Sequence, residues 1–183
     1  VVNDLVTLLD VSATTLALAG AELPNYLEGR NLFGSEYKAA EYVLGARDRC
    51  DYTIDRIRTV RSDRYRYIRN YYLDRPLMQP GYRDDRPPSK DMRRLFEAGE
   101  LTEYQAEHWF GLRPREEFYD MDADLHQIYN LASLPDFQAE LLRHREVLEN
   151  WINDSDDQGQ YSESDVQLRA TYELWKDRDI FKN

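Results

Sequence analysis

Apolar residues near the start of the chain recur at helical spacing. Over residues 4–19 this spacing predicts a helix that Asn3 or Asp4 can cap and that Gly20 can end. The residues on one face are Leu5, Leu8, Leu9, Ser12 and Leu16. Other sides of the same helix are also apolar, so we expect it to pack against something larger than the core of this chain.

Strand patterns begin farther along the chain. Residues 39–46 resemble a strand that ends in a charged run, and residues 57–61 and 64–70 predict a β-hairpin across Ser62 and Asp63. Residues 116–120 form a further short strand. Because side chains alternate along a strand, the second hairpin strand separates into two faces. These faces are Tyr65, Tyr67 and Arg69 on one side, and Arg66, Ile68 and Asn70 on the other.

Helical patterns return in the second half. Residues 73–90 hold four of the seven prolines and predict a long irregular excursion, which is often functional in compact domains. Helices are expected over 90–98 and 102–109. Pro135 starts a longer helix that reaches about Asn153, and residues 168–181 can form a terminal helix.

The order of these elements predicts an α+β fold. Its centre would be a small antiparallel sheet of about four strands packed on the helix at 135–153. The helix, loop and strand of residues 1–46 would belong to the end of a larger α/β core. Residues 47–153 would form a C-terminal subdomain, and residues 154–183 a polar tail.

Composition narrows the function. The net charge of −11 over 183 residues argues against a general nucleic-acid binder, because phosphate neutralisation needs a basic excess. Nowhere are there about 18 consecutive apolar residues, so we expect no membrane span. The first residues do not resemble a signal peptide and are typical of the middle of a protein. The single cysteine, Cys50, excludes an intrachain disulfide and a cysteine-rich zinc site.

Arginine concentrates in one stretch of this acidic chain. Residues 47–69 contain eight arginines against four aspartates, and a guanidinium group suits sulfate, phosphate and carboxylate oxygens. Most of these arginines are expected to line the solvated face of the hairpin. Arg47, Asp48 and Arg49 follow the expected end of a strand, where α/β sheets bind ligands. They are therefore substrate-binding candidates, although Arg47 and Asp48 could instead form a structural pair.

No complete catalytic site and no metal site is visible in the sequence. The three histidines lack metal-ligand spacing on one helix face. His108 is a further substrate-binding candidate, His126 is expected at the surface, and His144 in the core or at its boundary. The alternating residues Asp120, Asp122 and Asp124 lack the glycine and glutamate of a calcium loop and are interpreted as a solvated turn.

Four stretches, in order, resemble type I sulfatases. Residues 4–20 read DLVTLLDVSATTLALAG and resemble D-L-V-S-x-x-D-L-x-P-T-x-L-x-L-A-G. Residues 117–132 read EFYDMDADLHQIYNLA and resemble E-L-Y-D-L-x-x-D-P-x-E-x-x-N-L-A. Between them, residues 42–49 and 58–70 are similar to a strand and hairpin of that family, and GARDR is most similar to the heparan N-sulfatase branch. The sequence departs from the patterns at Ala13, Asn31, Leu125 and Gln127, which replace Pro, Ser, Pro and Glu.

The resemblance implies the C-terminal portion of an alkaline-phosphatase-like hydrolase of sulfate esters or sulfamates on sulfated sugars. It implies a formylglycine nucleophile and a calcium ion upstream of this chain. Cys50 lacks the Cys-x-Pro-x-Arg context of that nucleophile, so this chain alone should be inactive. The expected partners are a sulfated carbohydrate and either the missing N-terminal half or a second copy. The resemblance also implies a periplasmic or secreted protein.

Two alternatives stay open at this point. Phosphodiester and phosphonate hydrolases share the same scaffold, and a fold does not determine a substrate. The chain could also be a non-catalytic module whose tyrosine- and arginine-rich surface binds carbohydrate.

Overall fold

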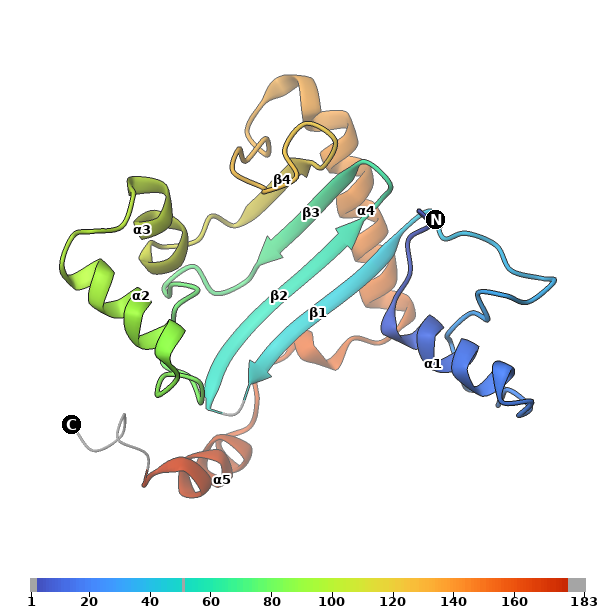
Figure 1. Cartoon of the computed structure of the whole chain (residues 1–183), viewed down its shortest axis with the longest axis horizontal. Coiled ribbons are helices and arrows are strands. Elements are labelled where there is room, and N and C mark those ends of the chain that lie inside the picture. Colours follow the sequence, from blue (N-terminus) through green and yellow to red (C-terminus); the bar gives the residue numbers. More distant parts are fainter. Residues whose placement is uncertain (1–2, 51, 178–183) are drawn as a thin grey trace.

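The computed structural model describes residues 3–50 and 52–177, and its centre is a four-stranded antiparallel sheet (Figure 1). The strands follow one another in the order β1-β2-β3-β4. Their bounds are Val43–Cys50 for β1, Thr53–Arg61 for β2, Tyr65–Asn70 for β3 and Glu116–Asp120 for β4. The expected sheet of about four strands is therefore confirmed.

The hairpin of β2 and β3 has the predicted alternation. Its turn is closed by the Ser62 amide, which donates to the Tyr65 carbonyl oxygen over 2.9 Å. Tyr65 and Tyr67 face the core, whereas Arg66 and Ile68 face the opposite side of the sheet. We call these two sides the covered face and the open face.

Helix α4, Gln138–Asp154, lies along the covered face of the sheet (Figure 1). It follows the 3₁₀ turn η1, Pro135–Phe137, which explains the predicted start at proline. The helix and the sheet enclose a core of buried side chains: Val60, Tyr67, Phe118, Leu141, Leu148 and Ile152. His144 is buried in this layer, as expected, where its Nε2 lies 2.9 Å from the Ser62 hydroxyl. Burial lowers the pKa of His144, so the ring is neutral there.

Strand β1 corrects the expected strand over 39–46. It runs from Val43 to Cys50 and pairs with β2 of the small sheet. The expected domain boundary at residue 46 thus falls inside β1. The charged residues that suggested a strand end belong to an outer strand, where charged side chains are common. A register shift between Arg47 and Arg49 marks a bulge near its end.

Helix α1, Leu8–Leu18, begins later than predicted. Its cap is Thr7 rather than Asn3 or Asp4, because Thr7 and Asp10 form a reciprocal capping box. Arg30 extends this arrangement by donating to Asp10 over 2.6 Å. The helix lies to one side of the sheet (Figure 1), and Leu8 and Leu18 are 83% and 70% exposed.

Two further segments frame the sheet. Between β3 and β4 lie helix α2, Pro87–Glu97, and helix α3, Glu103–Phe110, which Thr102 caps. After α4 come the short turn η2, Gln158–Gln160, and helix α5, Asp165–Trp175. The last residues of the expected terminal helix lie outside the described residues. No helix in the described ranges is both long and apolar enough to cross a membrane.

Candidate functional site

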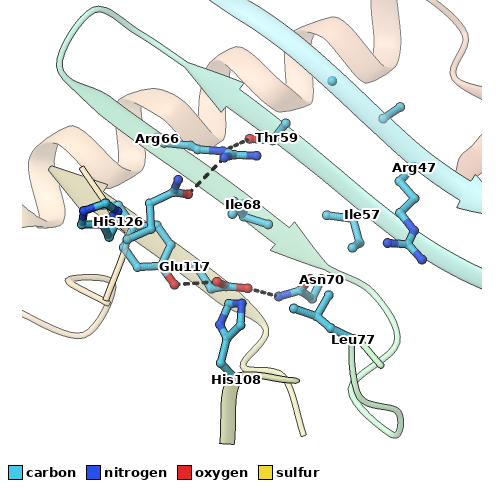
Figure 2. Close-up of a pocket in the computed structure, with 14 residues that line it drawn as sticks. Arg47, Ile57, Thr59, Arg66, Ile68, Asn70, Leu77, His108, Glu117 and His126 are labelled. Carbon is cyan, nitrogen blue, oxygen red and sulfur yellow. Dashed lines mark hydrogen bonds between the residues drawn. The ribbon is translucent and has the colours of Figure 1, made fainter. Parts of the chain in front are cut away.

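The open face of the sheet carries a hollow of about 500 Å³ (Figure 2). Its floor comes from alternate residues of the strands, and its rim comes from the segments before and after β4. At Gly45 a side chain would narrow the floor, since a Cβ there would lie 3.0 Å from Thr59 Cγ2. The lining residues are Gly45, Ala46, Arg47, Ile57, Thr59, Arg66, Ile68, Asn70, Leu77, His108, Glu117, Tyr119, His126 and Gln127.

Two guanidinium groups reach this hollow from opposite outer parts of its floor (Figure 2). Arg47 comes from β1, and its side chain is 45% exposed. Its Nε lies 3.7 Å from a carboxylate oxygen of Asp55, which already accepts from Arg113 over 2.8 Å. Arg66 comes from β3 and donates to the Thr59 hydroxyl and to the Gln127 side-chain carbonyl. Both groups are thus held by the protein while they face the hollow.

A carboxylate lies between these cations and α3. Glu117 accepts hydrogen bonds of 2.6 Å from the Asn70 amide and from the Tyr119 hydroxyl. Burial and the Glu117 carboxylate raise the pKa of Tyr119, so that hydroxyl stays protonated and donates. His108 projects from α3 toward the same part of the hollow (Figure 2) and stacks on Tyr104.

The predicted substrate-binding residues separate into two groups. Arg47 and His108 line the hollow, whereas Asp48 and Arg49 do not. Asp48 projects from the covered face and accepts from the buried Arg58 over 2.8 Å, because successive side chains of a strand point to opposite faces. Arg49 follows the bulge and donates to Glu163 over 2.7 Å. The alternative in which Arg47 pairs with Asp48 is therefore wrong, because in the described structure Arg47 lies near Asp55 and Asp48 pairs with Arg58.

Three parts of the hollow were not predicted from the sequence, namely Arg66, Glu117 and the pair of residues at 126–127. Arg66 could have been found, because the alternation of β3 already placed it on one face with Ile68 and Asn70. His126 is exposed, as predicted, and still contributes to the rim. Nothing in the sequence places Gln127 against Arg66, since this contact joins β3 to a segment far along the chain.

The arrangement is suited to binding an anionic ligand over an apolar floor. Guanidinium and imidazole groups surround Ile57 and Ile68, and the one lining carboxylate is held by neutral donors. Within residues 3–50 and 52–177, no group of three His, Cys, Asp or Glu side chains is placed to hold a metal ion. This part of the chain therefore does not fit the calcium ion that the family resemblance implies.

Comparisons with known proteins give relatives of one kind. No protein-family profile matches the chain. An ulvan-active sulfatase of Formosa agariphila is 33% identical over 88% of this chain, and a second one is 27% identical over 75%. The chain spans only 28% and 26% of the lengths of these two relatives.

Solved structures show the same relationship in the fold. A 2-O GAG sulfatase superposes over 92% of this chain and 30% of its own, with a TM-score of 0.58 and 23% identity. A putative sulfatase from Bacteroides thetaiotaomicron covers 87% of this chain and 28% of its own, with a TM-score of 0.55 and 23% identity. The expected placement in part of an alkaline-phosphatase-like fold is confirmed, while the heparan N-sulfatase branch stays a prediction. By sequence and by fold, this chain belongs to the sulfatase family and corresponds to its C-terminal portion.

Proposed function

We propose that the intact protein is a sulfuric ester hydrolase of sulfated polysaccharides, and that this chain supplies contacts on the substrate side. The observation that carries the proposal is the 33% identity to an ulvan-active sulfatase over 88% of the chain, together with the cationic hollow. In this scheme the nucleophile and the metal ion come from the rest of the sulfatase.

The lining of the hollow supports this division of labour. A guanidinium group can direct two N–H donors at sulfate or carboxylate oxygens, which suits Arg47 to an anionic sugar. Ile57 and Ile68 offer an apolar surface to the C–H face of a sugar ring. His108 and the Glu117 carboxylate add polar groups that can hydrogen-bond sugar hydroxyls.

The exposed apolar surface of α1 supports packing against the rest of the same polypeptide. Leu8, Leu9 and Leu18 are each more than half exposed. The relatives are more than three times as long as the stretch that matches this chain. Contiguous apolar surface usually marks an interface, so we propose that the remaining sulfatase fold packs on this helix.

Replacement of Arg47 tests the substrate-side role. In the intact protein, Arg47→Ala should lower kcat/KM for a sulfated oligosaccharide about tenfold, which is about 1.4 kcal/mol of transition-state stabilisation. A small aryl sulfate lacks the sugar contacts and should be affected less.

Arg49→Ala is the matched control, because Arg49 pairs with Glu163 and lies outside the hollow. Its kcat/KM should stay within about twofold of the parent value. Equal losses for the oligosaccharide and the aryl sulfate in Arg47→Ala would contradict the proposed contact.

A further inference from the structure

Two arginines face each other across the hairpin at the end of the hollow near Gln127. Arg61 of β2 and Arg66 of β3 are direct partners in the antiparallel register. Side chains in such pairs start about 5 Å apart, and like charges placed opposite each other destabilise a sheet. The pair therefore costs stability unless another group compensates its charge.

Neither arginine has a carboxylate partner within the described part of the chain. Other arginines of the hairpin do: Arg58, Arg64 and Arg69 form ion pairs with Asp157, Asp120 and Glu149. The Arg61 Nη1 atom is buried and has no hydrogen-bond partner among the described residues. Burial and the Arg66 charge lower the pKa of Arg61, while Asp63 and Asp122 oppose this without reaching hydrogen-bond distance. The charge of the pair is thus only partly compensated.

Gln127 orients Arg66 without neutralising its charge. Its side-chain carbonyl oxygen accepts from Arg66 Nη1 over 3.1 Å. The Gln127 backbone has a φ of +56°, a left-handed conformation that residues other than glycine adopt at a cost of about 1 kcal/mol. A glutamate at 127, as in the pattern quoted above, would place a negative charge on Arg66. The neutral amide leaves that charge available.

We propose that Arg66, backed by Arg61, binds an anionic group of the polysaccharide other than the sulfate that is hydrolysed. This assignment rests on the proposed function and adds a second charged subsite to it. Along β2, the partners of Arg47 and Arg66 are four residues apart, about 13 Å at 3.3 Å per residue. A ligand that spans both positions is longer than a single sugar, and Ile57 and Ile68 lie on the floor between them. The shared chemistry of the group is an oxyanion, either a uronic-acid carboxylate or a second sulfate ester.

Calorimetry on the intact protein tests the subsite without turnover. The probes are a sulfated oligosaccharide that contains uronic acid, its carboxyl-reduced counterpart, and a counterpart that has lost one sulfate per repeat. The parent protein should bind the full probe about tenfold more tightly than the counterpart that lacks the recognised oxyanion, as expected for a charged hydrogen bond. Whichever counterpart loses affinity identifies the oxyanion as carboxylate or sulfate.

Two variants and a control connect this discrimination to the pair. Arg66→Gln removes the positive charge of the guanidinium group. Gln127→Glu neutralises that charge with a side chain of almost the same shape as glutamine. Both should bind the full probe about tenfold more weakly and should discriminate less than about twofold between the probes. Arg94→Gln, which removes an exposed guanidinium group on α2, should preserve the parent discrimination.

The outcomes separate the two proposals. Equal binding of all three probes by the parent protein would overturn the subsite. The subsite would also be overturned if Arg66→Gln lost the same affinity for every probe. A lowered melting temperature with unchanged discrimination between the probes would overturn it too. Either result would assign Arg66 an internal partner elsewhere in the sulfatase. If the parent discriminates between the probes but does not hydrolyse a sulfate ester, the proposed function fails while the anion subsite stands.

Discussion

Arg58 is the most buried charged residue of the described structure, with no exposed surface. Its guanidinium group donates to Asp48 of β1 over 2.8 Å and to Asp157, after α4, over 2.8 Å and 3.0 Å. A buried cation is tolerated when its donors are satisfied in this way. The contact with Arg58 also lowers the pKa of Asp157, so that carboxyl stays ionised. This single side chain therefore joins two strands to the C-terminal segment.

Arg58→Met should destabilise the intact protein by about 3–5 kcal/mol, because it leaves the largely buried Asp157 carboxylate without its cation and also removes the partner of Asp48. Equilibrium urea denaturation measures this difference. Arg94→Met is the control, since Arg94 forms exposed ion pairs with Asp91 and Glu100 and should cost less than about 1 kcal/mol. Equal losses in the two variants would show that the Arg58 cluster contributes no more than a surface pair.

At the scale of elements, the fold depends on the contact between α4 and the covered face of the sheet. Leu148 is fully buried there, whereas Leu142 on the same helix is 53% exposed. The two leucines share chemistry and helix and differ in burial, which makes them a matched pair.

Leu148→Ala should lower the free energy of unfolding by about 2–5 kcal/mol, the range for a buried leucine that leaves a cavity. Leu142→Ala should cost less than about 1 kcal/mol, because most of its surface already contacts water. Chemical denaturation of both variants measures the two losses of unfolding free energy. Comparable losses would mean that α4 also packs on its outer side in the intact protein.

The cap of α1 gives an element-scale prediction with a pH dependence. Hydrogen bonds from Arg30, and then from the backbone of residues 30 and 7, lower the pKa of the Asp10 carboxyl below its ordinary value of 3.8. A folded pKa below the unfolded one stabilises the protein above the unfolded value. This stabilisation is then lost as the pH falls through the folded value.

Asp10→Asn should therefore cost about 1–3 kcal/mol near neutral pH, because Asp10 is buried and accepts charged hydrogen bonds. The difference from the parent protein should stay constant above about pH 5 and shrink below about pH 4. Unfolding measured across this range is the check. Glu36→Gln, at an exposed position of the segment after α1 that also carries Arg30, should show no such dependence. A constant difference down to pH 2 would contradict this origin.

The extent to which sequence predicted this structure follows from the range of each interaction. Local patterns predicted the β2–β3 hairpin, β4 and α4, because alternation, turn residues and an N-terminal proline act within a few residues. The extent of β1 was wrong because its pairing with β2, rather than its polarity, continues the strand through Arg47 and Asp48. Arg47 was predicted to bind substrate because it is an arginine at an expected strand end, although β1 continues past it to Cys50. His108 was a second substrate-binding candidate. Arg47 and His108 line the same hollow as Arg66 and Gln127 only because distant segments of the chain are in contact, and no local pattern predicts such contacts.

At the scale of the whole molecule, the chain spans 28% of the length of the ulvan-active sulfatase that it matches, and we propose that it is one part of a larger enzyme. The described residues hold no metal-binding cluster, and Cys50 is exposed and lacks the Cys-x-Pro-x-Arg context. Much of the apolar surface of α1 is uncovered. The exposed apolar surface agrees with the proposal that the intact protein covers this helix.

Purified alone, residues 1–183 should show no hydrolysis of an aryl sulfate, with or without added calcium. The chain should also self-associate through α1, because exposed apolar patches favour association. Light scattering coupled to size exclusion measures the second effect. The variant with Leu8→Ser and Leu18→Ser should shift toward monomer, whereas Leu142→Ser, at a half-exposed position of α4, should not. Calcium-dependent turnover by the isolated chain would contradict this assignment.

The position of α2 and α3 between β3 and β4 also affects how the site can diverge. That long connection carries Leu77 and His108 to the rim of the hollow, while β3 and β4 pair directly. The entropy of closing a loop grows only with the logarithm of its length, so doubling the connection costs about 0.6 kcal/mol. Insertions and deletions in this connection can reshape the rim, and they cost much less folding free energy than one cavity between α4 and the sheet. Changes in the preference for the proposed polysaccharide ligand should therefore accumulate in residues 71–115, where a change of length has a small effect on folding.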